Sequence, residues 1–423
     1  MLLPWTCSIC ALRCDDVLLE RAPQGIAVRP DCGLASEWIE RLASGPRRKP
    51  AVRGREVTWE AALAAARSIV QDANRLAIRG STPDVQTARA ACELAAAAGA
   101  VLDFVSPPAA HTLAAAVSRD GLTTATLGDV RQHADRIVRI GRPNRRWPRL
   151  DERFTAGKPT LAVLPAIANH TAEASAAERQ TQENLAQEDQ TTADANTLCL
   201  QTGWLDWLRS VLLQLQTSPA QHTDVSPAAE RLISFLRGGR YIALIIADDA
   251  WSGGEDAESG SWWLRLVERL GRDARCVLLL PDTNAAVRQT LLWRTGFSGP
   301  VTFSQHTPSL SPVAARCDAA VQLCPSFAAT PASGAEPDSV DAGLPTVLLG
   351  DHATPDASIE SAAVFLPVGW AGIDHAGTTV RGDGTVTLGL QPLPDTVLPH
   401  PNPHRAADVL AEFTNAIAHQ ERA

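Results

Sequence analysis

The chain has 423 residues, 45% hydrophobic and 20% charged, which is an ordinary globular composition with room for about two to four domains. Its formal net charge of -9 argues against a nucleic-acid or anionic-membrane partner, because both need a basic surface. Arg13, Asp15 and Asp16 interrupt any apolar run at the N-terminus, so we expect no secretory signal there. With no long apolar stretch and nine cysteines, too few for a disulfide scaffold, we expect a cytoplasmic protein without a membrane span.

Residues 1–55 are expected to form a cysteine-rich, strand-poor N-terminal domain. The segment "VTWEAALAAARSIVQDA" follows and predicts an amphipathic helix, with Thr58 as its cap and Glu60 in its first turn. Short apolar strands and helices then alternate, and we assign residues 56–165 to a first α/β unit.

Residues 166–200 are rich in Gln, Glu, Thr and Ala, which predicts a polar insertion or linker. The alternation of apolar strands and helices restarts afterwards, so residues 201–330 are assigned to a second α/β unit. Residues 331–423 are expected to return to the first unit and to end in a helix. Continuous apolar strands separated by helices indicate an α/β fold with two Rossmann-like parallel sheets.

Three thiols stand close together in "TCSICALRCDD", with the spacing Cys7-x2-Cys10-x3-Cys14, and Cys32 follows farther along. Three thiolates on one tight loop and a fourth from a returning segment are typical of a [4Fe–4S] cluster. Four thiolates also suit tetrahedral zinc, although zinc sites more often pair their ligands as two knuckles. A metal-free remnant of such a site is the third interpretation.

Two other features, a histidine and a glycine-rich stretch, could carry chemistry. His111, near a predicted strand end, is read as a hydrogen-bonded structural residue more readily than as a ligand. The stretch "GTTVRGDG", Gly377 to Gly384, fits either a loop that lets a ligand approach the backbone or a plain hairpin with "GDG" as its turn. No P-loop, G-x-S-x-G, H-E-x-x-H or clean G-x-G-x-x-G motif is present, and we assign no catalytic residue.

The segment "CSICALRCDDV" resembles the N-terminal signature of the B subunit of formylmethanofuran dehydrogenase, a molybdenum- or tungsten-pterin enzyme subunit. Further resemblance lies in "DGLTTATLGDVRQHADRIVRIG", "GRPNRRWPRLDERF", "LLWRTGFSGPVTFSQHTP" and "AGIDHAGTTVRGDGTVTL", in the same order. It spans nearly the whole chain. It implies a molybdopterin-oxidoreductase-like (formate dehydrogenase-like) catalytic-subunit fold, in which Cys7, Cys10, Cys14 and Cys32 would ligate the [4Fe–4S] cluster.

One departure from that family concerns its metal centre. Family dehydrogenases carry a Cys or selenocysteine followed by His-Gly-Pro upstream of the "TATLG" turn, whereas this chain has no cysteine between Cys92 and Cys199. A soft metal centre without its soft ligand loses the chemistry that the ligand tuned. We therefore expect the molybdopterin or tungstopterin to be lost.

The sequence most resembles the B subunit of the bacterial formyltransferase/hydrolase complex, a non-redox relative of the dehydrogenase. The resemblance implies a scaffold without its own active site, with an amidohydrolase-like A subunit, a C subunit and a formyltransferase D subunit as partners. Such a complex handles formyl groups on tetrahydromethanopterin- or methanofuran-type carriers in one-carbon metabolism and formaldehyde oxidation. Two alternatives stay open: a working tungsten or molybdenum dehydrogenase subunit, and a zinc-stapled interaction protein.

Overall fold

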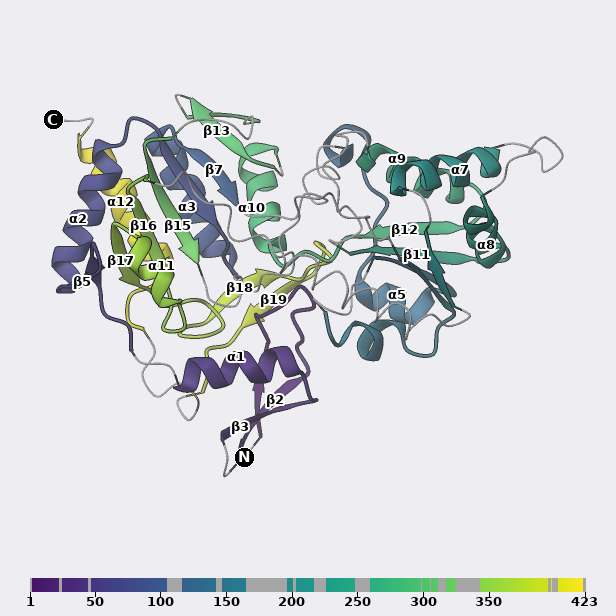
Figure 1. Ribbon diagram of the computed structural model, residues 1–423, viewed down its shortest axis with the longest axis horizontal. Helices are drawn as coiled ribbons and strands as arrows, with labels where there is room; N and C mark the ends of the chain where they lie inside the picture. The colour runs from purple at the N-terminus through teal and green to yellow at the C-terminus, as the bar shows by residue number, and fades with distance from the viewer. Residues whose placement is uncertain are drawn as a thin grey trace, which may run out of the picture. The chain divides into compact units, whose positions relative to one another are not determined.

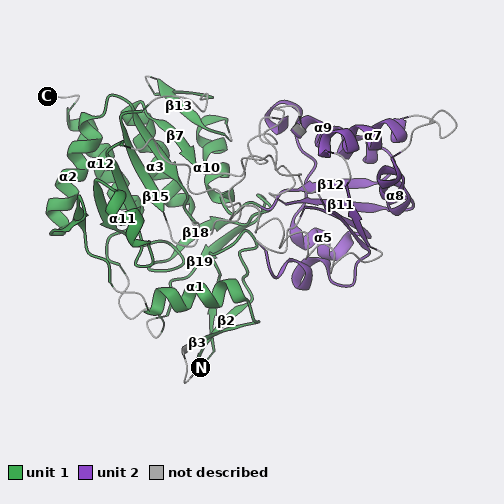
Figure 2. Ribbon diagram, viewed as in Figure 1, with its two compact units in different colours: residues 1–106, 282–331, 335–423 green, residues 107–281, 332–334 purple. Residues whose placement is uncertain are grey.

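The computed structural model describes residues 2–22, 25–44, 47–104, 116–141, 147–164, 196–200, 203–216, 226–247, 259–297, 299–304, 306–310, 317–324, 343–394, 397 and 402–420. The chain divides into two compact units (Figure 2). Unit 1 comprises residues 1–106, 282–331 and 335–423, and unit 2 comprises residues 107–281 and 332–334. Among the described residues, no helix is both long enough and apolar enough to cross a membrane.

A nine-stranded mixed sheet forms the centre of unit 1, in the order β14-β13-β7-β6-β15-β16-β17-β4-β5 (Figure 1). The middle strands β7, β6, β15, β16 and β17 run parallel, and short antiparallel strands extend both edges. Burial of the middle strands explains why they read as continuous apolar runs. The strands are β4 (Ala51–Val52), β5 (Arg55–Glu56), β6 (Leu76–Gly80), β7 (Val101–Phe104), β13 (Val301–Ser304), β14 (Thr307–Leu310), β15 (Ala319–Cys324), β16 (Thr346–Gly350) and β17 (Val364–Pro367).

Helices α2 (Trp59–Asp72), α3 (Val85–Ala98), α10 (Ala285–Thr295), α11 (Asp356–Ser361) and α12 (Ala406–Gln420) belong to the same unit. The prediction for α2 is confirmed: Thr58 is its N-cap and accepts a hydrogen bond from Ala61 N, and Glu60 lies in the first turn. α3 packs against both α10 and α12. Its many alanines leave room for α12 to place Phe413 in the core, and full burial of a Phe side chain contributes about 1.5–3 kcal/mol.

The N-terminal lobe of unit 1 contains a three-stranded antiparallel sheet, so the expectation of a strand-poor start was wrong. Its elements are β1 (Leu2–Trp5), β2 (Val17–Ala22), β3 (Gly25–Arg29) and α1 (Gly33–Ser44). In β2 the buried Val17 and Leu19 alternate with less buried neighbours, which is the pattern of a strand with one covered face. These strands are short, β1 contains Pro4, and Glu20 and Arg21 end the apolar run of β2, so their apolar runs are weak in the sequence.

The stretch Gly377–Gly384 belongs to a β-hairpin, which is the second of the two interpretations that the sequence allowed. Strand β18 (Gly377–Val380) pairs antiparallel with β19 (Thr387–Leu390). Gly384 lies in the turn with φ of 75°, a left-handed conformation that favours glycine.

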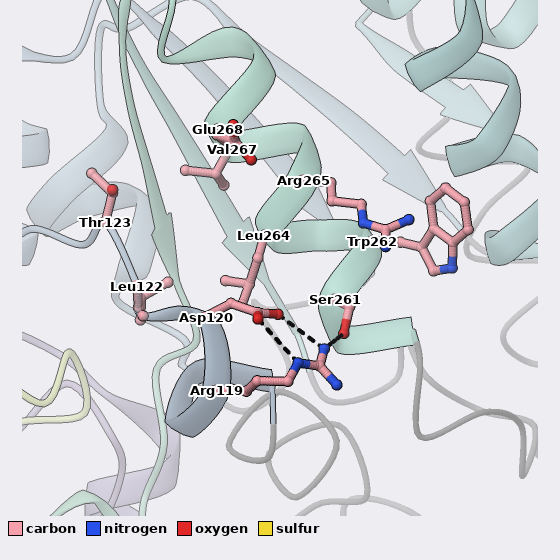
Figure 3. Close-up of a pocket in the computed structure, with 11 residues that line it drawn as sticks. Arg119, Asp120, Leu122, Thr123, Ser261, Trp262, Leu264, Arg265, Val267 and Glu268 are labelled. Atoms are coloured by element: carbon pink, nitrogen blue, oxygen red, sulfur yellow. Dashed lines mark hydrogen bonds and ion pairs between the residues drawn. The ribbon is translucent and has the colours of Figure 1, made fainter.

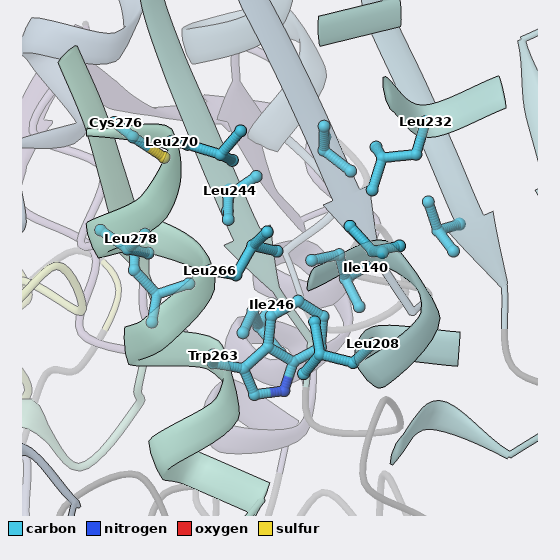
Figure 4. Close-up of a cluster of buried hydrophobic side chains, with 14 of the residues drawn as sticks. Ile140, Leu208, Leu232, Leu244, Ile246, Trp263, Leu266, Leu270, Cys276 and Leu278 are labelled. Carbon is cyan, nitrogen blue, oxygen red and sulfur yellow. The ribbon is translucent and has the colours of Figure 1, made fainter. Parts of the chain in front are cut away.

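Unit 2 is built on a five-stranded, wholly parallel sheet in the order β10-β9-β8-β11-β12. Its apolar core contains Leu244 and Ile246 of β11, packed near Trp263 and Leu208 from the covering helices (Figure 4). The elements are α5 (Leu127–His133), β8 (Arg136–Ile140), a short π-helix (Asp151–Thr155), β9 (Thr160–Leu164), β10 (Thr197–Cys199), α7 (Trp204–Gln216), α8 (Pro227–Leu236), β11 (Tyr241–Ile246), α9 (Ser259–Leu270) and β12 (Arg275–Leu279).

The division into units differs from the one read from the sequence. Strands β8 and β9 were grouped with the first unit, yet they join β11 and β12 in the sheet of unit 2. Helix α10 and strands β13 to β15 were grouped with the second unit, yet they belong to unit 1. A buried parallel strand looks the same in either sheet, because its pattern records burial and not its neighbours.

Candidate functional site

The three clustered cysteines lie in the connection between β1 and β2, which we call the thiol loop (residues 6–16). Cys7 N donates to Cys14 O at 2.9 Å, and Arg13 N donates to Cys10 O at 3.2 Å, so the loop is closed by its own backbone. Cys7, Cys10 and Cys14 are buried. Cys32 is half-buried and immediately precedes α1, where its carbonyl accepts a hydrogen bond from Ser36 N at 2.9 Å.

The four thiols are close enough to influence one another electrostatically. Burial, and then the nearby Cys10 and Cys14, raise the pKa of the Cys7 thiol well above its usual value, and Cys32 adds to the effect. Burial and then Cys14 raise the pKa of Cys10 to about 12. Without a bound cation these two thiols are therefore protonated at neutral pH, and binding a metal there would release protons.

The thiols lie near one another, but binding a metal also requires that their sulfur atoms point toward one position. Within the described part of the chain, no group of three or more His, Cys, Asp or Glu side chains is placed to hold a metal ion. The donor chemistry nevertheless fits a sulfur-ligated centre, because the four side chains are soft thiols on two neighbouring segments of one lobe. The [4Fe–4S] cluster expected from the sequence therefore stays a prediction.

Arg13 and Ser8 leave polar atoms of the thiol loop without partners. Arg13 is 1% exposed, has a left-handed φ of 44°, and donates through Nη2 to Thr283 O at 2.7 Å. Its Nε and Nη1, and Ser8 Oγ, are buried with no hydrogen-bond partner among the described residues. Such orphaned donors are the local observation that favours an acceptor beside the thiols.

Contacts from the C-terminal part of unit 1 hold the thiol loop and the end of β1 that leads into it. Trp5 Nε1 donates to Gly372 O at 2.9 Å, and Gly382 N donates to Ala11 O at 2.7 Å. A Cβ on Gly382 would lie 2.6 Å from both Ala11 Cβ and Ala11 O. The glycine of the "GDG" turn thus permits a close backbone approach, and the group that it approaches is the thiol loop itself.

Carboxylates follow three parallel strands of the unit 1 sheet, and we call Asp84, Asp351 and Asp374 the polar edge. Asp84 caps α3 by accepting from Thr87 N at 2.8 Å, and burial raises its pKa. Asp374 accepts from Trp370 N at 2.9 Å and Asn402 N at 2.6 Å, and burial raises its pKa to about 6. These hydrogen bonds give both carboxylates a structural task.

Two ion pairs lie close to the polar edge. Asp282 pairs with Arg288 at 3.1 Å, and Arg381 pairs with Asp383 at 2.8 Å. Both carboxylate side chains are nearly inaccessible, at 2% and 0%. From the sequence, only the glycines of this region were noted. The two ion pairs could not be predicted, because their residues belong to no recognisable motif.

The segment expected to carry the lost metal ligand lies at residues 105–128. His111 falls outside the described residues, as does the whole stretch 105–115. The "TATLG" turn is described: Thr126 and Asp129 form a capping box at the start of α5, with Asp129 N donating to Thr126 Oγ1 at 2.9 Å. The spacing T-x-x-D is the sequence signal for this cap, which was not among the predicted features.

A pocket of about 720 Å³ lies in unit 2, beside the start of α9 (Figure 3). Arg119 holds Asp120 through two hydrogen bonds, of 3.0 and 2.9 Å, and also contacts Ser261. The Arg265 guanidinium lies 4.8 Å from the ring centre of Trp262. No motif in the sequence predicted this pocket. Its ion pair is exposed and already neutral, so we assign it no chemistry.

Comparison with known proteins supplies a fold neighbour. No protein-family model matches the chain, and no curated protein is significantly similar to it. Among solved structures, the chain is similar to one from the X-ray crystal structure of the formyltransferase/hydrolase complex (FhcABCD) from Methylorubrum extorquens in complex with methylofuran. The TM-score is 0.64 at 22% identity, covering 88% of this chain and 100% of that chain. The likeness shows the fold, a mixed α/β chain with parallel sheets.

Proposed function

We propose that this chain is the non-redox B subunit of a formyltransferase/hydrolase complex, in which it acts as a scaffold. The complex would handle formyl groups on tetrahydromethanopterin- or methanofuran-type carriers in one-carbon metabolism, in the cytoplasm. The observation that carries the proposal is the shared fold over 88% of this chain and all of a chain from such a complex. The ordered sequence segments that resemble the B subunit family support the same choice of subunit.

The proposal includes a more specific fold for the chain. The chain would have the molybdopterin-oxidoreductase-like architecture, with the lobe of residues 1–55 as its cluster domain. A mixed sheet with a parallel centre, a wholly parallel sheet and a lobe that carries four cysteines are compatible with it. The partners would be an amidohydrolase-like A subunit, a C subunit and a formyltransferase D subunit.

A scaffold is favoured over a redox enzyme by the missing soft ligand. No cysteine stands between Cys92 and Cys199, where the dehydrogenase family places the residue that binds its pterin metal. The carboxylates of the polar edge do not replace a thiolate, because Asp84 and Asp374 are engaged by backbone N–H groups. We therefore assign no molybdopterin or tungstopterin to the chain and no catalytic residue.

The four cysteines are proposed to hold a [4Fe–4S] cluster. Cys7, Cys10 and Cys14 would bind from the thiol loop, and Cys32 from the segment before α1. Such a cluster supplies one-electron transfer when bound. In a scaffold the cysteines' own contribution is structural, because ligands from two segments crosslink a small lobe and so favour its folded state.

Co-expression with the A, C and D subunits tests the proposal. A tag on this chain should retain all three partners through size exclusion, and the assembly should hydrolyse a formylated carrier to formate. The isolated chain should show no activity, and neither sample should contain molybdenum or tungsten by elemental analysis. If the tagged chain retained none of the three partners, the scaffold proposal would be contradicted.

A catalytic dehydrogenase subunit is the second candidate, because the chain keeps all four cysteines of the cluster signature. Molybdenum or tungsten near one per chain, with formate-dependent dye reduction, would establish it. A zinc-stapled interaction protein is the remaining alternative. One zinc per chain, with neither iron nor the three partners, would favour that alternative.

A further inference from the structure

The thiol loop holds more buried hydrogen-bond donors than its protein surroundings use. Arg13 Nη2 has an acceptor, Thr283 O, whereas Arg13 Nε, Arg13 Nη1 and Ser8 Oγ have none among the described residues. Leaving a buried donor unpaired costs about 1–3 kcal/mol, and more when the group is charged. Three such atoms within six residues of one loop call for an acceptor-rich partner.

The neighbours of Arg13 narrow the position of that partner. The titratable groups within electrostatic range of its guanidinium are Cys10, Cys7, Asp282 and Asp84. Asp282 is paired with Arg288, and Asp84 caps α3. A group bound by the thiols would lie beside Arg13, because Cys10 and Cys7 are among its electrostatic neighbours.

The backbone conformation of Arg13 also fixes its side chain beside the thiols. Its φ of 44° is a left-handed conformation that costs a non-glycine residue about 1–2 kcal/mol. The hydrogen bonds of Arg13 N to Cys10 O and of its side chain to Thr283 O maintain that conformation. Strain retained at a buried charged residue indicates that the placement of the side chain is constrained by its surroundings.

We propose that Arg13 and Ser8 donate hydrogen bonds to the sulfur atoms of the cysteine-held cluster, and that Arg13 offsets its negative charge. Arg13 is thus a positioning and charge-balancing residue for a centre bound by Cys7, Cys10, Cys14 and Cys32. The inference rests on the [4Fe–4S] cluster proposed above. Membership of the complex does not depend on it.

The test is a redox titration of the full chain, purified anaerobically and followed by electron paramagnetic resonance. A nearby positive charge and hydrogen bonds to sulfur favour the more negative, reduced cluster and so raise its potential. Arg13→Met should therefore shift the midpoint to a more negative value, and Arg13→Lys should recover part of the shift. Ser8→Ala should give a smaller shift in the same direction.

A buried arginine elsewhere supplies the matched control. Arg149 of unit 2 has a 3% exposed side chain and an ion pair with Glu152, so Arg149→Met should leave the midpoint unchanged. If Arg13→Met loses its iron, Ser8→Ala and Arg13→Lys still decide, because each makes a smaller change in the loop. Midpoints equal to wild type in both of these variants would overturn the inference.

The metal content of the wild type separates this inference from the proposed function. Wild-type chain with about four irons allows the titration to proceed. Chain with zinc, or without metal, overturns the role of Arg13 at a cluster. If that same metal-free chain retains the three partners, the scaffold proposal stands while this inference fails.

Discussion

Unit 2 and the N-terminal lobe of unit 1 are stabilised in different ways. The core of unit 2 consists of aliphatic and aromatic side chains on parallel strands and their covering helices (Figure 4). Many residues contribute to its stability. The thiol loop and the adjoining end of β1 depend on a few specific contacts, among them Trp5 to Gly372 and Ala11 to Gly382. The first kind of region tolerates local change but loses global stability when a large side chain is removed. The second can detach while the rest of the fold persists.

Removal of a large core side chain should have the largest effect. Trp263→Ala, at a position 3% exposed, should lower the free energy of unfolding by about 3–5 kcal/mol through lost burial and a cavity. Chemical denaturation measures it. Trp293 is 60% exposed and serves as the control, because Trp293→Ala should change stability little. Equal effects of the two substitutions would contradict the assigned core.

The polar edge should make the stability of unit 1 depend on pH. The pKa of Asp374 is about 6, above its unfolded value of 3.8, so the folded state binds the extra proton between these values. Stability from this group is present below pH 4 and is lost as pH rises through 6, by up to about 3 kcal/mol.

Melting temperatures of wild type and Asp374→Asn between pH 4 and 7.5 check this pH dependence. The neutral amide does not titrate, so the difference between the two proteins should change over this window. A difference independent of pH would contradict the raised pKa.

Disturbing the contact between Gly382 and the thiol loop should loosen that loop without unfolding the rest of the protein. Gly382→Ala would place a Cβ 2.6 Å from Ala11, and relief of that overlap should cost about 1–3 kcal/mol. Amide hydrogen exchange should rise in residues 6–16, with little change in β11. Gly389→Ala is the matched control, since a Cβ there meets nothing within 4 Å. Unaltered exchange in the loop of Gly382→Ala would contradict the close approach.

The cap of α2 should give the smallest effect. Thr58→Ala removes the acceptor for Ala61 N and should cost about 1 kcal/mol. The exposed Thr307 of β14 has no such task, so Thr307→Ala should cost less. Denaturant midpoints compare the two variants, and the reverse order would argue against the cap.

The elements that could be predicted from the sequence are those with strong local patterns. Helix α2 with its Thr58 cap and the buried strand β11 lie where the periodicity and apolar runs place them. The strands of the N-terminal lobe were missed because they are short, with Pro4 in β1 and the polar Glu20 and Arg21 in β2. The sheet to which β8 belongs could not be predicted. An apolar run in the sequence indicates that a strand is buried, but not that β8 pairs with β11 and β9.

For the candidate site, the thiols could be found from spacing alone, but their surroundings could not. Gly372, Thr283 and Gly382 reach the thiol loop across most of the chain, and Trp5 and Gly372 are 367 positions apart. The left-handed conformation of Arg13 and its unpaired donors have no sequence signal. Convergence of ligands depends on tertiary contacts, and the cluster stays a prediction for that reason.

The interrupted course of unit 1 has a consequence for how the protein is made. Leu76 of β6 pairs with Ala319 of β15, so the central sheet of unit 1 stays incomplete while residues 107–281 leave the ribosome. Unit 2 is almost continuous in the chain and can fold during synthesis. The thiol loop is synthesised before Gly372 and Gly382, and it gains these contacts only after both glycines have left the ribosome. Its cysteines therefore stay accessible to metal-delivery factors and to oxidants until those two glycines are in place, and closure of the lobe follows their synthesis.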